Sequence, residues 1–136
     1  MTVLSTGTWF VAMRTPGNVC STANLPADRD CLVNVDVNGE PVPSARFMGG
    51  REIEILMGGA EWPDANGDEA QAAADAVIAQ GAMVLPTFAA GAGPYGPCSG
   101  RWLSMPREPL QRGAAVCLYA ALLADTALDL IGSWRG

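Results

Sequence analysis

The chain has 136 residues, of which 49% are hydrophobic and only 16% are charged, so it can bury a substantial core. Its length suits one domain or one large subdomain. The formal net charge is −6 and there is no run of basic residues, which argues against nucleic acid or an anionic membrane surface as a partner. The chain has no histidine, so Ser-His-Asp or Cys-His catalysis and histidine-ligated metals are excluded within these residues.

The cysteines and the N-terminus indicate the compartment. None of the four cysteines lies in a C-x-x-C pair, so a zinc site is poorly supported. The start of the chain has no basic leader of the kind found in signal peptides, and we expect a cytoplasmic protein with reduced thiols. Cys117 falls within an apolar helical pattern and is expected to be a small core residue.

A short turn rich in hydroxyl groups lies near the N-terminus and leads into an apolar run over residues 9–13. Gly7 has no Cβ, so its backbone can approach a ligand closely. Ser5, Thr6 and Thr8 place hydroxyls beside it, and backbone N–H groups in such a turn can form an anion-binding concavity. The apolar run predicts a strand that holds the turn rigid. The alternative is a purely structural loop, since short Gly/Ser/Thr motifs are weak signals.

Residues 31–48 predict a β-hairpin, preceded by a loop over residues 14–30. Valines alternate with polar residues before an Asn-Gly pair at 38–39, which favours a tight turn because both residues tolerate positive φ. The returning arm contains Pro41 and Pro43, which donate no ladder hydrogen bonds. We therefore expect that arm to be short or to lie at a sheet edge.

Two helices are expected next. Residues 49–57 predict a Gly-Gly turn followed by a short helix, ended by a second Gly-Gly pair, and residues 68–80 predict a longer helix. Asp68 suits the N-cap or first turn of the longer helix, and Gly81 suits its C-cap. Its apolar stripe is mostly alanine, which predicts close packing on a flat surface such as a sheet. The stripe consists of Ala70, Ala73, Ala74, Val77 and Ile78.

The C-terminal half predicts one short strand and one long helix. Residues 83–86 indicate a short buried strand that leads into a turn region over 87–97. Glycines in that region match G-x-G-x-x-G, but prolines prevent the helix that a dinucleotide site requires. Residues 109–131 predict the long helix, whose apolar run over 114–124 is too short to span a bilayer. Asp125 and Asp129 share one face of this helix, and we expect them to face solvent or a neighbouring subdomain.

Three blocks of the sequence carry a family resemblance. They are Ser5-Thr6-Gly7-Thr8-Trp9; the hairpin 35–39 with Arg46-Phe47-Met48-Gly49-Gly50-Arg51-Glu52; and 84–88 with Gly91-Ala92-Gly93-Pro94-Tyr95 and Gly100-Arg101-Trp102. The first two blocks resemble FGGY carbohydrate kinases, in particular the fuculokinase and rhamnulokinase branches, and the third is similar to a pattern of the glycerol kinases and xylulokinases of that family. Their order and spacing make the resemblance more specific than any block alone.

The resemblance implies an α/β fold, part of an actin-like ATPase (ribonuclease-H-like) domain with a mixed sheet, a β-hairpin and packing helices. Residues 1–136 would form a single partial domain, a segment of the C-terminal nucleotide-binding domain. Family members transfer the γ-phosphoryl group of ATP to a sugar hydroxyl, with Mg²⁺ bridging the phosphates. The motif positions imply nucleotide contacts at Thr6, Gly7 and Thr8, and less directly at Gly49 and Gly50. Glu54 lies on the adjacent helix. An approach to the nucleotide is one interpretation of this position, and packing or solvation is its expected role.

The resemblance also implies that other parts of a kinase are needed. The family's catalytic aspartate lies upstream of the hydroxyl turn, and its adenine-binding motif follows the long helix, so we assign no catalytic or metal-ligating residue to this chain. The low charge content fits a surface buried against the remaining kinase parts or a partner chain, with self-association possible. The sugar would contact mainly those other parts.

Two other hypotheses remain open at this stage. One is a non-catalytic binding or scaffold domain derived from such a kinase. The other is an unrelated small α/β ligand-binding protein whose Gly/Thr turns are only structural. Binding of Mg·ATP near Gly7 and Thr8 would discriminate the kinase-derived turn from the structural one.

Overall fold

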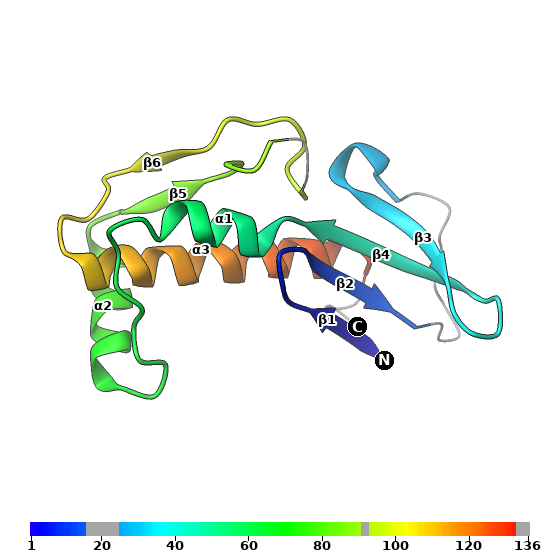
Figure 1. Ribbon diagram of the computed structural model, residues 1–136, viewed down its shortest axis with the longest axis horizontal. Helices are drawn as coiled ribbons and strands as arrows, with labels where there is room; N and C mark the ends of the chain where they lie inside the picture. Colours follow the sequence, from blue (N-terminus) through cyan, green and yellow to red (C-terminus); the bar gives the residue numbers. More distant parts are fainter. Residues whose placement is uncertain (16–24, 91–92, 133–136) are drawn as a thin grey trace.

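The computed structural model describes residues 1–15, 25–90 and 93–132 (Figure 1). In these residues, two antiparallel sheets and two shorter α-helices are arranged around one long helix. In chain order the elements are β1 (Thr2–Ser5), β2 (Phe10–Arg14), the 3₁₀-helix η1 (Ala27–Arg29), β3 (Cys31–Val35), β4 (Pro41–Phe47), α1 (Gly49–Leu56), α2 (Asp68–Ala79), β5 (Met83–Leu85), β6 (Arg101–Leu103) and α3 (Pro109–Leu130).

The larger sheet has four strands in the order β1-β2-β4-β3, and its strand pairs are antiparallel. The strands β5 and β6 form a separate antiparallel pair. The mixed sheet expected from the resemblance is therefore not formed by the described residues. Parallel neighbours require a crossover connection, whereas every described strand pair here runs antiparallel.

The position of β4 corrects the expectation of a short or edge strand. It is seven residues long and central, although it contains Pro41 and Pro43. The N–H of Arg46 points toward the β3 side, where it donates to the Asp30 carbonyl at 3.2 Å. Backbone N–H groups alternate sides along a strand, so the two proline nitrogens face β2. The last described pair on that side is Met13 with Ser44, so both prolines lie beyond the ladder they would interrupt.

The N-terminal strands differ in detail from the prediction. The strand expected at residues 9–13 is present as β2, shifted by one residue. It is preceded by β1, which was not predicted, because its four residues do not alternate between apolar and polar. The predicted 14–30 loop lies partly outside the described residues, and its later part contains η1.

The first helix begins earlier than the sequence predicted. Gly49 and Gly50 form the first turn of α1 instead of a separate glycine turn before it. The helix ends at Leu56, before the second Gly-Gly pair, as predicted. Leu56 is buried, and Ile53 and Met57 pack against the same core, which confirms the expected face.

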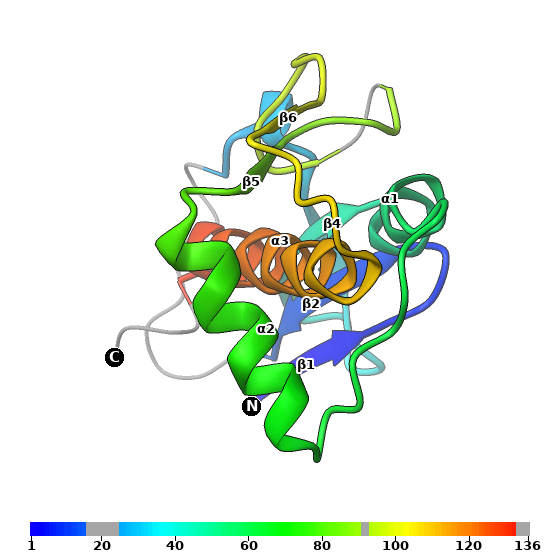
Figure 2. The same cartoon turned by 90° about the vertical axis from the view of Figure 1, so that its left-hand side faces the viewer.

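The second helix begins as predicted and ends one residue earlier, at Ala79, but it has a different neighbour. It packs on α3, as Figure 2 shows in a view along α3, and not on a sheet. Ala73 and Val77 are buried, whereas Ile78 is 66% exposed, which corrects its assignment to the apolar stripe. A helix contacts another helix along a narrower line than it would contact a sheet, so one edge of the stripe remains outside. Gly81 adopts φ +63° just after the helix, as expected of a C-cap.

The long helix α3 provides the core. Val116, Tyr119 and Leu123 pack with Phe47 of the sheet in the main buried cluster. Cys117 lies on the other side of the helix and is exposed, so its expected core position was wrong.

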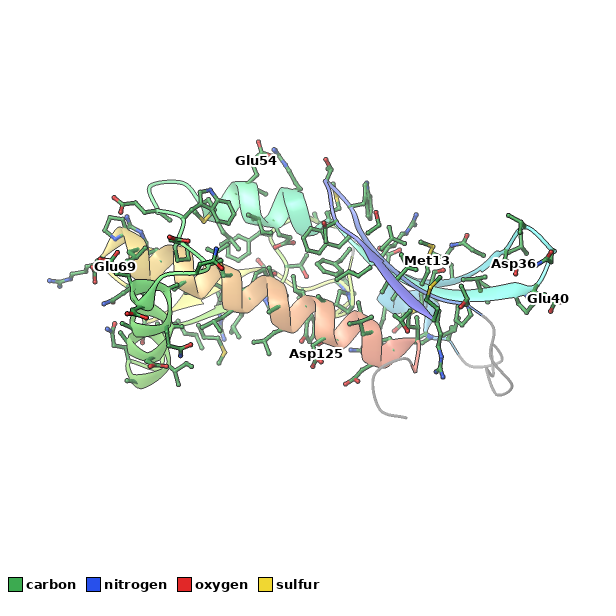
Figure 3. All side chains as sticks on the ribbon, turned by 90° about the horizontal axis from the view of Figure 1, so that it is seen from below. Met13, Asp36, Glu40, Glu54, Glu69 and Asp125 are labelled. Atoms are coloured by element: carbon green, nitrogen blue, oxygen red, sulfur yellow. The ribbon has the colours of Figure 1, made fainter. Side chains whose placement is uncertain are left out.

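The whole helix α3 is also long and apolar enough to cross a membrane by length and composition alone. Core helices of soluble proteins pass the same test, so this is weak evidence, and here the helix packs against both sheets. Figure 3 shows Asp125 pointing away from the helix, on the outward face expected for the aspartate pair.

The predicted short strand and turn region are both present in the C-terminal half. β5 pairs with β6, and its central residue Val84 is buried, but Met83 is 48% exposed. No helix forms between β5 and β6 in the part of that connection that the structure describes. This agrees with the rejection of a dinucleotide-binding helix there.

Candidate functional site

The hydroxyl turn, Thr6 to Trp9, connects β1 to β2 and lies against the start of α1. A Cβ added at Gly50 would come within 2.2 Å of the Gly7 carbonyl oxygen and 2.9 Å of the Thr8 Cα. Only a residue without a side chain fits so close to another backbone segment. The structure therefore brings together two predicted segments that are far apart in the sequence.

The glycines at this junction have different surroundings. A Cβ at Gly7 would meet only the Trp9 carbonyl oxygen, at 3.8 Å, so space beside Gly7 is open. A Cβ at Gly49 would lie 2.6 Å from the Phe10 ring and 2.8 Å from the Phe47 ring. Gly49 is buried, so its lack of a side chain serves the packing of the two rings, which lie 5.0 Å apart.

The turn presents polar groups to solvent. Its residues are exposed. The structure shows no hydrogen bond from the Thr6 or Thr8 hydroxyl, or from the backbone N–H groups of residues 6–9, to another described residue. Backbone N–H groups and hydroxyls gathered in one exposed turn are suited to bind an anion.

The first turn of α1 adds further donors next to the hydroxyl turn. Met48 is the N-cap and provides no side-chain cap, and the N–H of Glu52 is the first to bond back to it, at 2.9 Å to the Met48 carbonyl. The N–H groups before Glu52 therefore lack partners within the helix, and the helix dipole gives this end a partial positive charge. Gly50 is where this end meets the turn.

A positive side chain lies beside the turn. The guanidinium of Arg46 is 5.2 Å from the centroid of the Trp9 ring, a cation–π arrangement. Its Nε also donates to Asp30 Oδ1 at 2.8 Å, and the Arg46 side chain is half exposed. This arginine was not singled out as a candidate from the sequence. Its position on β4 next to the turn depends on strand register, which the sequence did not reveal.

One carboxylate of α1 is deeply buried. Glu52 is 2% exposed, and its carboxylate accepts hydrogen bonds from the Phe88 N–H, the Ala89 N–H and the Tyr119 hydroxyl. Burial, followed by the nearby Glu52 charge, raises the pKa of Tyr119, so the phenol remains a donor. The cluster joins α1, the segment after β5, and α3.

The sequence pointed to the neighbouring Glu54 instead of Glu52. Glu54 is on the outer side of α1 (Figure 3), where its carboxylate pairs with Arg51 at 2.7 Å and is 69% exposed. This confirms solvation as its role. A usable signal for Glu52 was its spacing of four residues from Leu56, which places both on the same helix face.

The described residues contain no group of three or more His, Cys, Asp or Glu side chains placed to hold a metal ion. The described cysteines, Cys31, Cys98 and Cys117, are free thiols. The candidate site is therefore an arrangement of backbone N–H groups and hydroxyls, with one arginine beside it.

Comparisons with known proteins identify the family of the chain. Residues 1–135 match the family model for the C-terminal domain of the carbohydrate kinase FGGY. The crystal structure of a carbohydrate kinase from Novosphingobium aromaticivorans is 55% identical, with a TM-score of 0.85, over 97% of this chain and 29% of that chain. No curated protein matches the chain. Because the family model spans nearly the whole chain, the protein belongs to the FGGY carbohydrate kinases and corresponds to part of their C-terminal domain.

Proposed function

We propose that this chain provides a phosphate-binding surface for ATP in an FGGY-type carbohydrate kinase. The observation that carries the proposal is the contact of Gly7 and Thr8 with Gly50 at the start of α1, beside open space at Gly7. This arrangement puts unpaired donors from a turn and from a helix N-terminus at one exposed place. Family membership supplies the chemical class of the ligand.

The residues of the turn fit a polyphosphate. The N–H groups of Gly7 and Thr8 and the hydroxyls of Thr6 and Thr8 would donate to phosphate oxygens, and Gly50 lets the helix end approach them. ATP would supply the γ-phosphoryl group for transfer to a sugar hydroxyl. Mg²⁺ is usually held by phosphates, waters and one or two carboxylates, so it would arrive largely with the nucleotide.

The chain would bind phosphate without completing the reaction. Phosphoryl transfer needs a carboxylate to accept the proton of the attacking hydroxyl, and the resemblance implies that this group belongs to another part of the kinase. The chain spans 29% of the length of the solved carbohydrate kinase. We therefore propose that the sugar site and the catalytic carboxylate are supplied by other parts of a complete kinase.

An apolar groove on the chain is a candidate contact surface for the other parts of the kinase. It lies between β5 and α3, has a volume of about 420 Å³, and is lined by residues that include Met83, Tyr95 and Leu122. Leu122 is 57% exposed, and Met83 beside it is 48% exposed. Grouped exposed apolar side chains of this kind can be covered at an interface with another protein part. We propose that the remaining kinase parts, or a second copy of the chain, cover it.

We also propose that the kinase belongs near the fuculokinase and rhamnulokinase branch. The support is the hairpin 35–39 followed by Arg46-Phe47-Met48-Gly49-Gly50-Arg51-Glu52, which resembles that branch. Phosphorylation assays of the complete kinase with fucose-type, rhamnose-type and unrelated sugars test this placement. Turnover restricted to unrelated sugars would contradict it.

Titration of the chain with Mg·ATP, followed by backbone amide shifts, tests the phosphate surface. We expect shifts confined to Gly7, Thr8 and the start of α1, and their loss in Thr8→Ala. The Thr8 hydroxyl makes no hydrogen bond to another described residue, so this variant should remain folded. Thr2→Ala on the exposed strand β1 is the matched control and should bind normally. A folded chain without shifts at these amides at millimolar nucleotide would contradict binding by this chain.

A further inference from the structure

We propose that Glu52 is a positioning residue that holds the glycine end of α1 against the hydroxyl turn by anchoring α1 to the Phe88–Ala89 backbone and to Tyr119. The proposal rests on the proposed phosphate surface, because the position of that surface is what Glu52 would control. The nucleotide contacts implied by the resemblance lie at Thr6, Gly7, Thr8, Gly49 and Gly50, and they do not include Glu52.

The two oxygens of the Glu52 carboxylate are fully used. Oε1 accepts from the Phe88 N–H at 2.9 Å and from the Ala89 N–H at 2.7 Å. Oε2 accepts from the Phe88 N–H at 3.0 Å and from the Tyr119 hydroxyl at 2.9 Å. Hydrogen bonds to an ionised carboxylate are roughly twice as strong as those between neutral groups. The cluster therefore fixes the first turn of α1 from two directions.

Because the cluster is buried, loss of the Glu52 carboxylate leaves its donors without a replacement acceptor. A buried carboxylate is costly unless it is hydrogen-bonded, and the N–H groups of Phe88 and Ala89 would lose this acceptor without it. Ala89 is 6% exposed, so water cannot easily replace the lost acceptor. Substitution of Glu52 should therefore displace α1 relative to residues 87–89, and not merely remove an independent surface contact.

The short separation between Glu52 and Gly50 transmits that displacement to the turn. Both residues lie in the first turn of α1. Gly50 has no spare room against the Gly7 carbonyl oxygen, because even one added carbon would come within 2.2 Å of it. A shift of the helix end must therefore move the turn or open a gap beside it.

Glu52→Leu tests the proposal, because it removes the acceptors and keeps a large side chain. We expect amide shifts at Gly7 and Thr8 without nucleotide, faster hydrogen exchange at Phe88 and Ala89, and about tenfold weaker Mg·ATP affinity. Leu56→Ala is the matched control. Leu56 is 6% exposed, so the substitution removes a buried side chain from the same helix but leaves the carboxylate cluster intact. It should lower stability and leave the Gly7 and Thr8 shifts unchanged.

Two conservative variants cover the case in which Glu52→Leu does not fold. Glu52→Gln keeps the shape and one acceptor oxygen, and Tyr119→Phe removes only the phenol donor. We expect the same amides to shift in both variants, with smaller amplitude, and Glu52→Gln should restore most of the affinity lost in Glu52→Leu. Unchanged Gly7 and Thr8 amides in the folded variants would overturn the positioning role. If the unsubstituted chain fails to bind Mg·ATP, the phosphate surface fails, whereas the shifts measured without nucleotide still decide the role of Glu52.

Discussion

Two turns of the same sheet are built in opposite ways. The turn at the tip of the β3–β4 hairpin, from Asp36 to Glu40, closes on itself (Figure 3). Asp36 Oδ1 accepts from the Asn38 N–H at 2.8 Å and from the Glu40 N–H at 2.9 Å, and the Gly39 N–H donates to the Asp36 carbonyl at 3.0 Å. Its donors are satisfied within a few residues.

The turn between β1 and β2 lacks such internal closure. Its hydroxyls and backbone N–H groups have no hydrogen-bond partner among the described residues. Its shape depends on Gly50, which belongs to α1. The difference suggests that a turn shaped from outside can leave its donors free for a ligand, whereas a self-closed turn uses them to stabilise the hairpin.

The largest expected effect comes from removing the outside support. Gly50→Ala would place a methyl group 2.2 Å from the Gly7 carbonyl oxygen, and backbone cannot yield as a flexible side chain can. We expect a loss of about 1–3 kcal/mol in the free energy of unfolding, as for overpacked cores, with amide shifts across residues 6–9. Chemical denaturation and amide spectra measure both. An unchanged unfolding midpoint would show that α1 does not constrain the turn.

The self-closed turn should respond to strain of a different kind. Gly39 has φ +82° with nothing near the position of an added Cβ, so Gly39→Ala is strained only by its backbone conformation. We expect a loss of about 1–2 kcal/mol, the cost of a left-handed conformation for a residue with a side chain. Mg·ATP binding should not change. Val37→Ala is the control, since this side chain is fully exposed at the same hairpin tip.

Acid should weaken the self-closed turn through Asp36. The N–H groups of Glu40 and then Asn38 donate to the Asp36 carboxylate and lower the pKa of Asp36. A lowered folded-state pKa adds stability above the unfolded value of about 3.9, and this stability is lost as pH falls through the folded value. The difference in unfolding midpoint between the unsubstituted chain and Asp36→Asn should therefore shrink as the pH falls from neutral to about 3, where carboxyl groups begin to be protonated. A difference independent of pH would contradict this account.

The same contrast explains what the sequence could predict. The Asn38-Gly39 turn was predicted from local conformational preferences, and the helices α2 and α3 from their periodicity and flanking Gly and Pro residues. The location of the hydroxyl turn was predicted from its residues and the family resemblance. In each case the signal lies within a short stretch of chain.

Features that depend on tertiary neighbours were missed or misplaced. The central position of β4 depends on where β2 stops, and the exposure of Cys117 depends on which face of α3 meets the sheet. The buried Glu52 is satisfied by residues 88, 89 and 119, which no local pattern places beside it. Long-range contacts of this kind decide the candidate site, whereas local preferences decided most of the elements.

The smallest expected effect on folding concerns Gly7. Substitution at this position tests whether the open space beside the turn is used by a ligand. Its φ lies outside the left-handed region and an added Cβ would meet only one atom, at 3.8 Å. Gly7→Ala should therefore leave stability unchanged or raise it by up to about 1 kcal/mol, since alanine restricts the unfolded chain. Gly58→Ala is closely matched, because its Cβ would also meet a single carbonyl oxygen at 3.8 Å, at the far end of α1. If a phosphate uses the open space, only Gly7→Ala should weaken Mg·ATP binding in a titration. Equal affinity of the two variants would mean that the space beside Gly7 is not where the ligand approaches the turn.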